Sequence, residues 1–314
     1  MIISASRRTD IPAFYSEWFY NRIREGYVYV PNPYNGKMIS RVALTPDVVD
    51  CIVFWTKNPA PMLDGLGKLN DYKYYFQFTL NPYGNDIENN IPLLSRRIEI
   101  FRELSDKIGK EKVVWRYDPI LTNDKYTVEY HKEAFAEIAY ALRGHTEKCM
   151  LGFIDHYHHI RNAVGKFGIE PLKADEIEEM AASFRDTLSE YPMELDTCTV
   201  KVDLRHMGIP SGLCVDGNLI ERITGYPIKA KKDRNQRDIC NCIESIDIGT
   251  YESCLNGCIY CYAIKGNYAT AGCNNRRHDP RSPLMIGSVE ELEADVQIKD
   301  REMKSLRNRQ QSLF

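Results

Sequence analysis

Alternating strand-like and helix-like segments in the first 200 residues constrain the fold of this 314-residue chain more than any other feature. Six short segments are rich in β-branched and aromatic residues and are bounded by turn or polar residues, as is typical of strands. They are residues 1–6, 51–56, 74–80, 113–117, 149–155 and 193–200. Apolar residues recur near the helical period in 94–108, 126–142 and 174–188. This alternation predicts parallel βα units.

The number of these units favours an α/β fold, a partial or full parallel βα barrel of about six units. No Gly-x-Gly-x-x-Gly follows the first predicted strand, which argues against a dinucleotide-binding sheet. Polar residues follow every predicted strand, and the strand ends of a βα barrel form its catalytic face. We therefore expect a polar pocket in which Asp10, Lys57, Arg116 and Asp118 bind substrate or cosubstrate. The alternative is that these side chains form ion pairs at the barrel rim.

The pattern changes after residue 200, where strand and helix alternation stops and Gly, Cys and Asn become frequent. The sequence predicts a barrel at 1–200, a loop-rich appendage at 201–287 ordered by its cysteines, and a polar helix with a tail at 288–314. The helix is expected because Ser288-Val289-Glu290-Glu291 fits a capping box.

Composition excludes several classes of protein. A hydrophobic fraction of 43% and a charged fraction of 27% are those of a globular chain rather than a disordered one. The net charge of −3 argues against holding nucleic acid by bulk electrostatics alone. No apolar run reaches the roughly 18 residues of a membrane span, and the N-terminal residues lack a signal-peptide pattern. We expect a cytoplasmic protein with no membrane contact.

Eight of the ten cysteines lie between residues 198 and 273. In a reducing compartment, such a concentration indicates metal or redox chemistry rather than a disulfide framework. Its sharpest part is the C-x3-C-x2-C triplet of Cys254, Cys258 and Cys261. Three thiolates on a tight loop can hold three irons of a [4Fe–4S] cluster and leave the fourth iron open. The alternative is zinc or a structural knuckle, although zinc needs a fourth ligand.

The remaining cysteines fall into two groups. Cys51 and Cys149 lie inside apolar runs and are expected to be buried structural thiols. Four others could hold a second [4Fe–4S] cluster or a tetrahedral zinc, or remain unligated or redox-active thiols. These four are Cys198, Cys214, Cys240 and Cys242, and Cys273 could substitute for any of them.

The triplet, with Tyr260 before its last cysteine, resembles the cluster motif of the radical S-adenosylmethionine enzymes. The whole chain resembles an uncharacterised bacterial family of unknown function whose C-terminal cysteine cluster looks like theirs. Residues 6–10, 55–58, 115–119 and 236–242 carry this resemblance. The Thr56-Lys57 and Arg116-x-Asp118-Pro119 pieces are also similar to the spore photoproduct lyase branch. In ordinary members the triplet follows the first barrel strand, whereas here it follows all six.

The resemblance implies a [4Fe–4S] cluster held by Cys254, Cys258 and Cys261, with S-adenosylmethionine at its open iron and Tyr260 in the cofactor site. It implies a 5′-deoxyadenosyl radical acting on an unknown substrate, for which the lyase similarity suggests a nucleic acid. It also implies a small electron-donor protein of flavodoxin or ferredoxin type.

Two other classes of function stay open at this point. The chain could be a zinc-stabilised module that binds nucleotides or nucleic acid without radical chemistry. It could also be a metal-dependent hydrolase that uses the Asp-His-Tyr-His-His block at 155–159.

The C-terminal tail from Gln310 to Phe314 resembles the Gln-Leu-Ser-Leu-Phe motif with which bacterial polymerases and repair proteins bind the sliding clamp. Gln311 replaces the leucine of that motif, so we expect a weak clamp contact at most. The alternative is that Leu313 and Phe314 fold back onto the protein's own surface.

Overall fold

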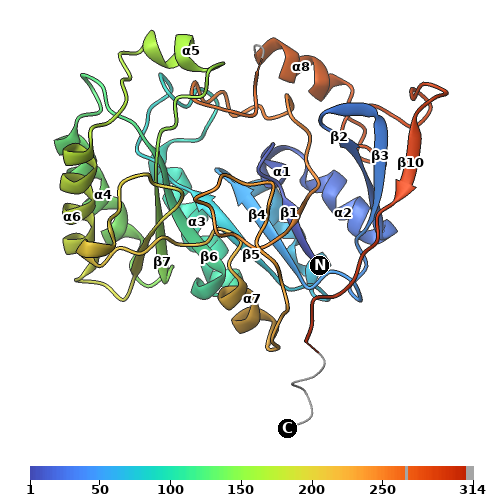
Figure 1. Cartoon of the computed structure of the whole chain (residues 1–314), viewed down its shortest axis with the longest axis horizontal. Helices are drawn as coiled ribbons and strands as arrows, with labels where there is room; N and C mark the ends of the chain where they lie inside the picture. Colours follow the sequence, from blue (N-terminus) through green and yellow to red (C-terminus); the bar gives the residue numbers. More distant parts are fainter. Residues whose placement is uncertain (266–267, 309–314) are drawn as a thin grey trace.

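The computed structural model describes residues 1–265 and 268–308 and contains one large parallel sheet (Figure 1). The sheet has the strand order β8-β7-β6-β5-β4-β1-β9, and every neighbouring pair is parallel. Its strands are β1 (Ile2–Ala5), β4 (Cys51–Thr56), β5 (Tyr74–Thr79), β6 (Val113–Ile120), β7 (Lys148–Phe153), β8 (Glu194–Thr197) and β9 (Ile246–Asp247). The six strands predicted from the sequence are therefore confirmed.

Helices follow most of these strands, as expected for βα units. The three predicted helices are confirmed as α3 (Leu94–Ile108), α4 (Val128–Leu142) and α6 (Ala174–Leu188). The others are α1 (Ile11–Phe14), α2 (Ser16–Glu25), α5 (Arg161–Gly165), α7 (Gly217–Thr224) and α8 (Tyr268–Arg276). Short 3₁₀ segments are η1 (Ala60–Leu69), η2 (Lys110–Lys112) and η3 (Arg205–Met207).

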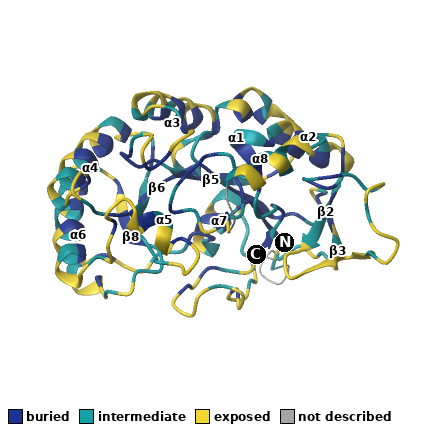
Figure 2. Cartoon of the chain, turned by 90° about the horizontal axis from the view of Figure 1, so that it is seen from above, coloured by how far each residue is buried: buried dark blue, intermediate teal, exposed yellow. Residues whose placement is uncertain are grey.

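The two faces of the sheet are covered differently. Helices α3, α4 and α6 lie along its outer, convex face, as the view from above shows (Figure 2). Alternate strand residues, such as Phe54, Phe76 and Trp115, point into the core on that side, where Phe135 of α4 stacks on Trp115. Because side chains alternate along a strand, the residues between these must face the other way.

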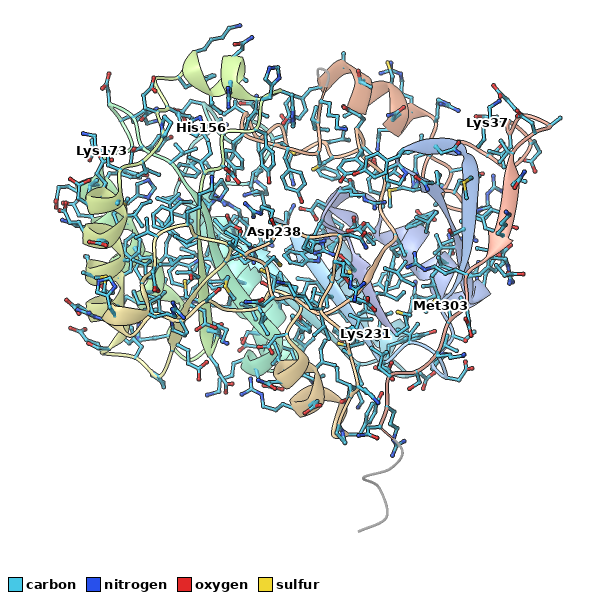
Figure 3. All side chains as sticks on the ribbon, in the orientation of Figure 1. Lys37, His156, Lys173, Lys231, Asp238 and Met303 are labelled. Atoms are coloured by element: carbon cyan, nitrogen blue, oxygen red, sulfur yellow. The ribbon has the colours of Figure 1, made fainter. Side chains whose placement is uncertain are left out.

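The inner face of the sheet is covered by irregular chain from the cysteine-rich segment. Val53, Tyr75 and Val114 share a buried cluster there with Cys214 and Ile220. Lys231 and Asp238 mark loops that cross in front of the strands (Figure 3). The alternation that turns Trp115 outward therefore turns Arg116 toward this covering segment.

The predicted parallel α/β architecture is confirmed, whereas closure of the sheet into a barrel is not. Strands β8 and β9 are the two edges of the sheet, and no ladder joins them within residues 1–265 and 268–308. The segment 201–287, expected as a loop-rich appendage, contributes β9 to the main sheet through pairing with β1. It also contains helices α7 and α8.

A second sheet of three strands was not anticipated from the sequence. It comprises the antiparallel hairpin β2 (Tyr27–Asn32) and β3 (Asn35–Ala43) with β10 (Gln297–Asp300) parallel to β3. The helix expected from Ser288 is wrong. The Glu291 amide donates to the Ser288 carbonyl at 3.3 Å in a turn, and the chain then extends into β10. A short polar helix has no apolar face to bury, whereas pairing with β3 satisfies backbone groups.

Two further sequence predictions concern membrane spans and the C-terminal tail. No helix in the described part of the chain is both long and apolar enough to span a membrane. The proposed clamp-binding tail, Gln310 to Phe314, lies outside the described residues.

Candidate functional site

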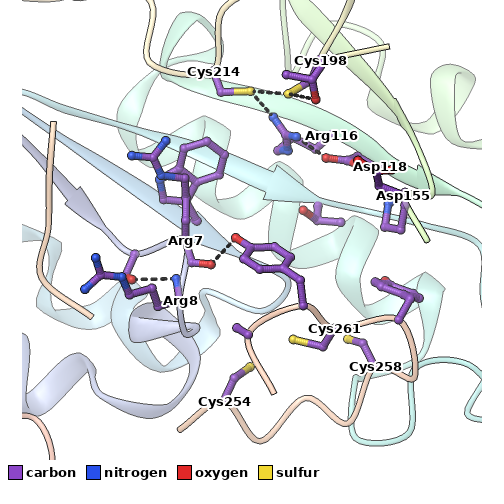
Figure 4. A pocket seen from close by; sticks show the side chains of 18 of the residues that line it. Arg7, Arg8, Arg116, Asp118, Asp155, Cys198, Cys214, Cys254, Cys258 and Cys261 are labelled. Carbon is purple, nitrogen blue, oxygen red and sulfur yellow. Dashed lines mark hydrogen bonds and ion pairs between the residues drawn. The ribbon is translucent and has the colours of Figure 1, made fainter. Parts of the chain in front are cut away.

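A cavity of about 410 Å³ opens where the main strands end. Its wall includes all four residues predicted as substrate or cosubstrate ligands, Asp10, Lys57, Arg116 and Asp118. It also includes seven cysteines, and Figure 4 shows Cys198 and Cys214 on the side opposite Cys254, Cys258 and Cys261. The cysteine loop, residues 254–261, carries Cys254, Cys258 and Cys261. The four-cysteine group comprises Cys198, Cys214, Cys240 and Cys242.

The cysteine loop is fixed against the segment that follows β5. The Asn90 amide donates to the Asn256 carbonyl and the Ile259 amide donates to the Ile87 carbonyl, each at 3.0 Å. Between these bonds Gly257 has a φ of 71°, and a Cβ there would lie 2.9 Å from the Cβ of Asn89. Only glycine fits both the positive φ and the close approach to Asn89. Gly257 therefore forms the turn between Cys254 and Cys258.

Asp10 connects this loop to two strand ends. One carboxylate oxygen accepts the Ala13 amide at 3.0 Å and so caps α1, directly after β1. The other accepts the Lys57 amide at 2.8 Å and the Asn256 side-chain amide at 3.0 Å. Burial raises the pKa of Asp10, and the hydrogen bonds from Thr56, Lys57 and Asn256 oppose that rise. Asp10, which the sequence predicted to bind substrate or cosubstrate, thus connects the ends of β1 and β4 to the cysteine loop.

Lys57 joins the loop to the main sheet through a buried ion-pair network. Its ammonium lies 2.8 Å from a Glu88 carboxylate oxygen and 2.9 Å from the Tyr260 hydroxyl. Tyr260 donates to the same carboxylate, and Arg97 approaches its other oxygen at 3.4 Å. Burial alone would raise the pKa of Glu88, but the charges of Lys57 and Arg97 outweigh it and the pKa is lowered. Glu88 therefore stays ionised with only 1% of its surface exposed.

These contacts place the cysteine loop at the carboxyl ends of β1 and β4. The Tyr262 hydroxyl, just beyond the last loop cysteine, donates to the Arg7 carbonyl after β1. Asp247 of β9 holds the same β1 end, accepting the Arg7 amide at 2.8 Å. A triplet that is C-terminal in the sequence is thus adjacent to the residues that follow the first strand.

The three loop cysteines lie together on the cavity wall. Burial raises the pKa of all three thiols, that of Cys261 to about 12, so metal binding would have to displace their protons. The backbone amides of Asp10 and Asn256 oppose this rise at Cys254, and those of Ala263 and Ile264 oppose it at Cys261. Amide hydrogen bonds to sulfur are a recurrent support of iron–sulfur clusters. Three thiols facing a cavity fit a cluster with one open iron.

On the opposite wall, the four-cysteine group collects residues from three loops. The Cys198 and Cys214 sulfur atoms lie 3.0 Å apart, and the Cys214 amide donates to the Cys242 sulfur at 3.2 Å. Cys240 hydrogen-bonds Cys242, which lowers the pKa of Cys240 to about 7. The cysteine pattern of the sequence offered these four residues as ligands of one centre despite their long spacings, and the tertiary structure brings them to the same wall of the cavity.

Arg116 and Asp118 lie between the two cysteine groups (Figure 4). The Arg116 guanidinium pairs with Asp118 and donates to the Cys214 sulfur at 2.8 Å. It also lies 5.2 Å from the Trp55 ring centroid, and Arg7 lies 5.7 Å from the same centroid. Two cations therefore flank the Trp55 ring at the cavity wall.

The 155–159 block does not form a metal centre. Asp155 pairs with Arg237 at 2.8 Å, and a ring nitrogen of His159 lies 3.1 Å from the Tyr262 carbonyl. Throughout residues 1–265 and 268–308, no three His, Cys, Asp or Glu side chains are arranged to hold a metal ion. This finding does not favour a hydrolase with a mononuclear site. A cluster differs in this respect because each thiolate binds a separate iron.

Sequence reasoning missed the residues that position the cysteine loop. Glu88, Arg97, Asn256 and Asp247 are polar yet buried or nearly so. Glu88, Asn256 and Asp247 each bond residues distant in the chain, and Arg97 supports Glu88. Asn256 stands inside the triplet and could have been noticed there. No local signal distinguishes Glu88 from a solvent-exposed loop glutamate.

Comparison with known proteins identifies one family. The family described as "Domain of unknown function (DUF1848)" matches residues 2–263. No curated protein matches the chain. No solved structure matches it either.

Proposed function

The chain belongs to the DUF1848 family, and we propose that it is a radical S-adenosylmethionine-type enzyme with a [4Fe–4S] cluster on Cys254, Cys258 and Cys261. The observation that carries the proposal is the position of the cysteine loop beside the end of β1. The enzymes that the triplet resembles have their cysteines directly after the first barrel strand. Here, contacts from Asn256 to Asp10 and from Tyr262 to Arg7 bring a distant loop to the equivalent place.

When bound, such a cluster and S-adenosylmethionine supply a 5′-deoxyadenosyl radical by one-electron cleavage of the sulfonium. This chain's residues hold and shield the site. Asp10 and the Lys57–Glu88–Tyr260 network fix the cysteine loop to the strand ends. Trp55 and the Arg116–Asp118 pair form the facing wall, where the cosubstrate or substrate would lie.

The proposal requires an electron donor, which we expect to be a small protein of flavodoxin or ferredoxin type. A nucleic-acid-related substrate and a weak sliding-clamp contact through Gln310 to Phe314 are further parts of the same proposal. The cations around the cavity are paired with carboxylates, so they offer little free positive charge to a phosphate backbone. This pairing supports a site for a small molecule or for one nucleotide turned out of its strand, rather than for a long stretch of nucleic acid.

The test is anaerobic reconstitution with iron and sulfide, followed by electron paramagnetic resonance with and without S-adenosylmethionine. We expect a [4Fe–4S]⁺ signal that changes when S-adenosylmethionine is added, together with 5′-deoxyadenosine formation under a chemical reductant. The cysteine-loop variant (Cys254→Ala, Cys258→Ala, Cys261→Ala) should lose both. Cys273→Ser is the matched control, because Cys273 is exposed and absent from the cavity wall.

Three results would contradict the proposal. These are a colourless protein that carries only zinc, a spectrum unaffected by S-adenosylmethionine, and 5′-deoxyadenosine formation that survives in the cysteine-loop variant. Zinc alone would favour the binding-module alternative.

A further inference from the structure

We infer that the four-cysteine group, Cys198, Cys214, Cys240 and Cys242, binds a second iron–sulfur cluster on the opposite wall of the cavity. The inference rests on the proposed function for its iron–sulfur chemistry, but its ligands and its position are independent of the cysteine loop. Four thiolates complete the ligand set of a [4Fe–4S] cluster and leave no iron open.

The first argument is the convergence of the four residues. Cys198 follows β8, Cys214 precedes α7, and Cys240 and Cys242 lie in the loop before β9. Contacts nevertheless link Cys198, Cys214 and Cys242 in one series, from the Cys198 sulfur to that of Cys214 at 3.0 Å, then through the Cys214 amide to the Cys242 sulfur at 3.2 Å. Cys240 stands two positions before Cys242 and also lines the cavity. Chance would seldom gather four of ten cysteines from three separate loops.

The second argument is that donors surround these sulfur atoms. Arg116 donates to the Cys214 sulfur at 2.8 Å. The Cys242 sulfur accepts the amides of Cys214 at 3.2 Å and Val215 at 3.4 Å. Such donors stabilise thiolates, the form in which cysteine binds metal. An anionic centre here would also place negative charge beside the buried Arg116 guanidinium, for which Asp118 is the only carboxylate counter-charge among residues 1–265 and 268–308.

The third argument concerns the chain that carries the cysteines. Between β8 and β9, regular structure is limited to η3 and α7 in this wholly described stretch, yet Cys214, Cys240 and Cys242 are buried against the inner face of the sheet. An irregular segment of this length is expensive to order by packing alone. A bound centre linking its loops would contribute directly to its folding.

The four thiols, as they lie without a metal, would have to rearrange for either a cluster or a single zinc ion. Two thiolates on one tetrahedral zinc, at about 2.3 Å from the metal, lie about 3.8 Å apart. The Cys198 and Cys214 sulfur atoms are closer than this, and none of the described cysteines forms a set arranged around one ion. The thiolates of a cluster each bind their own iron and lie farther apart still, so loading with either centre would move the Cys198 and Cys214 sulfur atoms apart. The choice of a cluster over zinc therefore rests on the iron–sulfur chemistry of the proposed function, and the metal analysis below decides it.

The decisive experiment measures iron, sulfide and zinc, with Mössbauer spectra, in anaerobically reconstituted wild-type protein and the cysteine-loop variant. We expect about eight irons per chain in the wild type and about four in the variant, since each [4Fe–4S] cluster contributes four. Alkylation followed by mass spectrometry should show the four-cysteine group protected in the loaded variant and reactive after chelation. Circular dichroism confirms that each protein is folded.

Each result separates the two proposals. A folded cysteine-loop variant without iron overturns the second cluster and leaves the first intact. A variant with as much iron as the wild type removes the first and supports the second. One zinc per chain in place of iron overturns the cluster assignment at the four-cysteine group. Cys198→Ser and Cys242→Ser, introduced singly into the variant, should each lower its iron content, whereas Cys273→Ser should not.

Discussion

Replacing Glu88 with glutamine tests how the cysteine loop is held. In the described part of the chain, Glu88 is the one carboxylate that pairs with Lys57, at 2.8 Å, and with Arg97, at 3.4 Å, and only 1% of its surface is exposed. Glu88→Gln keeps the shape of the side chain but leaves two buried cations without their counter-charge. Breaking a buried pair in this way costs about 3 to 5 kcal/mol. We expect the lower end, because Arg97 keeps hydrogen bonds to the carbonyls of Asn81 and Pro92.

The measurement is the free energy of unfolding from guanidinium chloride titration of the anaerobic apoprotein at pH 7. The control is Glu99→Gln, which removes another glutamate–arginine pair, with Arg96 at 2.7 Å. Both members of that pair are more than half exposed, so the expected loss is less than about 1 kcal/mol. The Glu88 variant should also retain less iron, since Tyr260 loses its carboxylate partner.

The pH dependence supplies a second check. The folded-state pKa of Glu88 is lowered, so its contribution to stability is fully present above the unfolded value near 4.5. It is lost as the pH falls through the lower folded value. The difference between wild type and Glu88→Gln should therefore be constant from pH 7 to 5.5 and shrink at more acidic pH. A loss no larger than that of the control, or one that grows on acidification, would refute the reasoning.

Three further changes probe other parts of the structure. Gly257→Ala should reduce the cluster content several-fold, because the new Cβ would lie 2.9 Å from the Cβ of Asn89. The control Gly36→Ala should leave the cluster content unchanged, because a Cβ there has nothing within 4 Å. Equal iron content in the two variants would contradict this prediction. Burial lowers the pKa of His131 to about 4, so the unfolded state alone gains a proton below pH 6.5. Stability should fall by about 2 kcal/mol between pH 6.5 and 5 in chemical denaturation, and His131→Asn should flatten that fall. Phe135→Ala should lower the free energy of unfolding by about 3 to 5 kcal/mol, because this fully buried ring leaves a cavity; less than 1 kcal/mol would contradict its core role.

Elements with a strong local signal could be predicted from the sequence. The six strands are runs of apolar and β-branched residues, and the three long helices carry an apolar stripe, so each element's own residues specify it. The hairpin β2–β3 was missed because exposed polar residues interrupt its alternation. The Ser288 segment was misjudged because a capping pattern without an apolar face does not maintain a helix.

The cysteine spacing and the polar strand ends also followed from the sequence alone, and they named most of the residues that line the cavity. Only the tertiary structure placed the triplet beside Asp10, 246 positions away from Asn256, and gathered Cys198, Cys214, Cys240 and Cys242 on the facing wall. The physical reason is that a loop has little conformational preference of its own. Its place is set by bonds to partners such as Glu88 and Asp247, which become neighbours only after the sheet has formed.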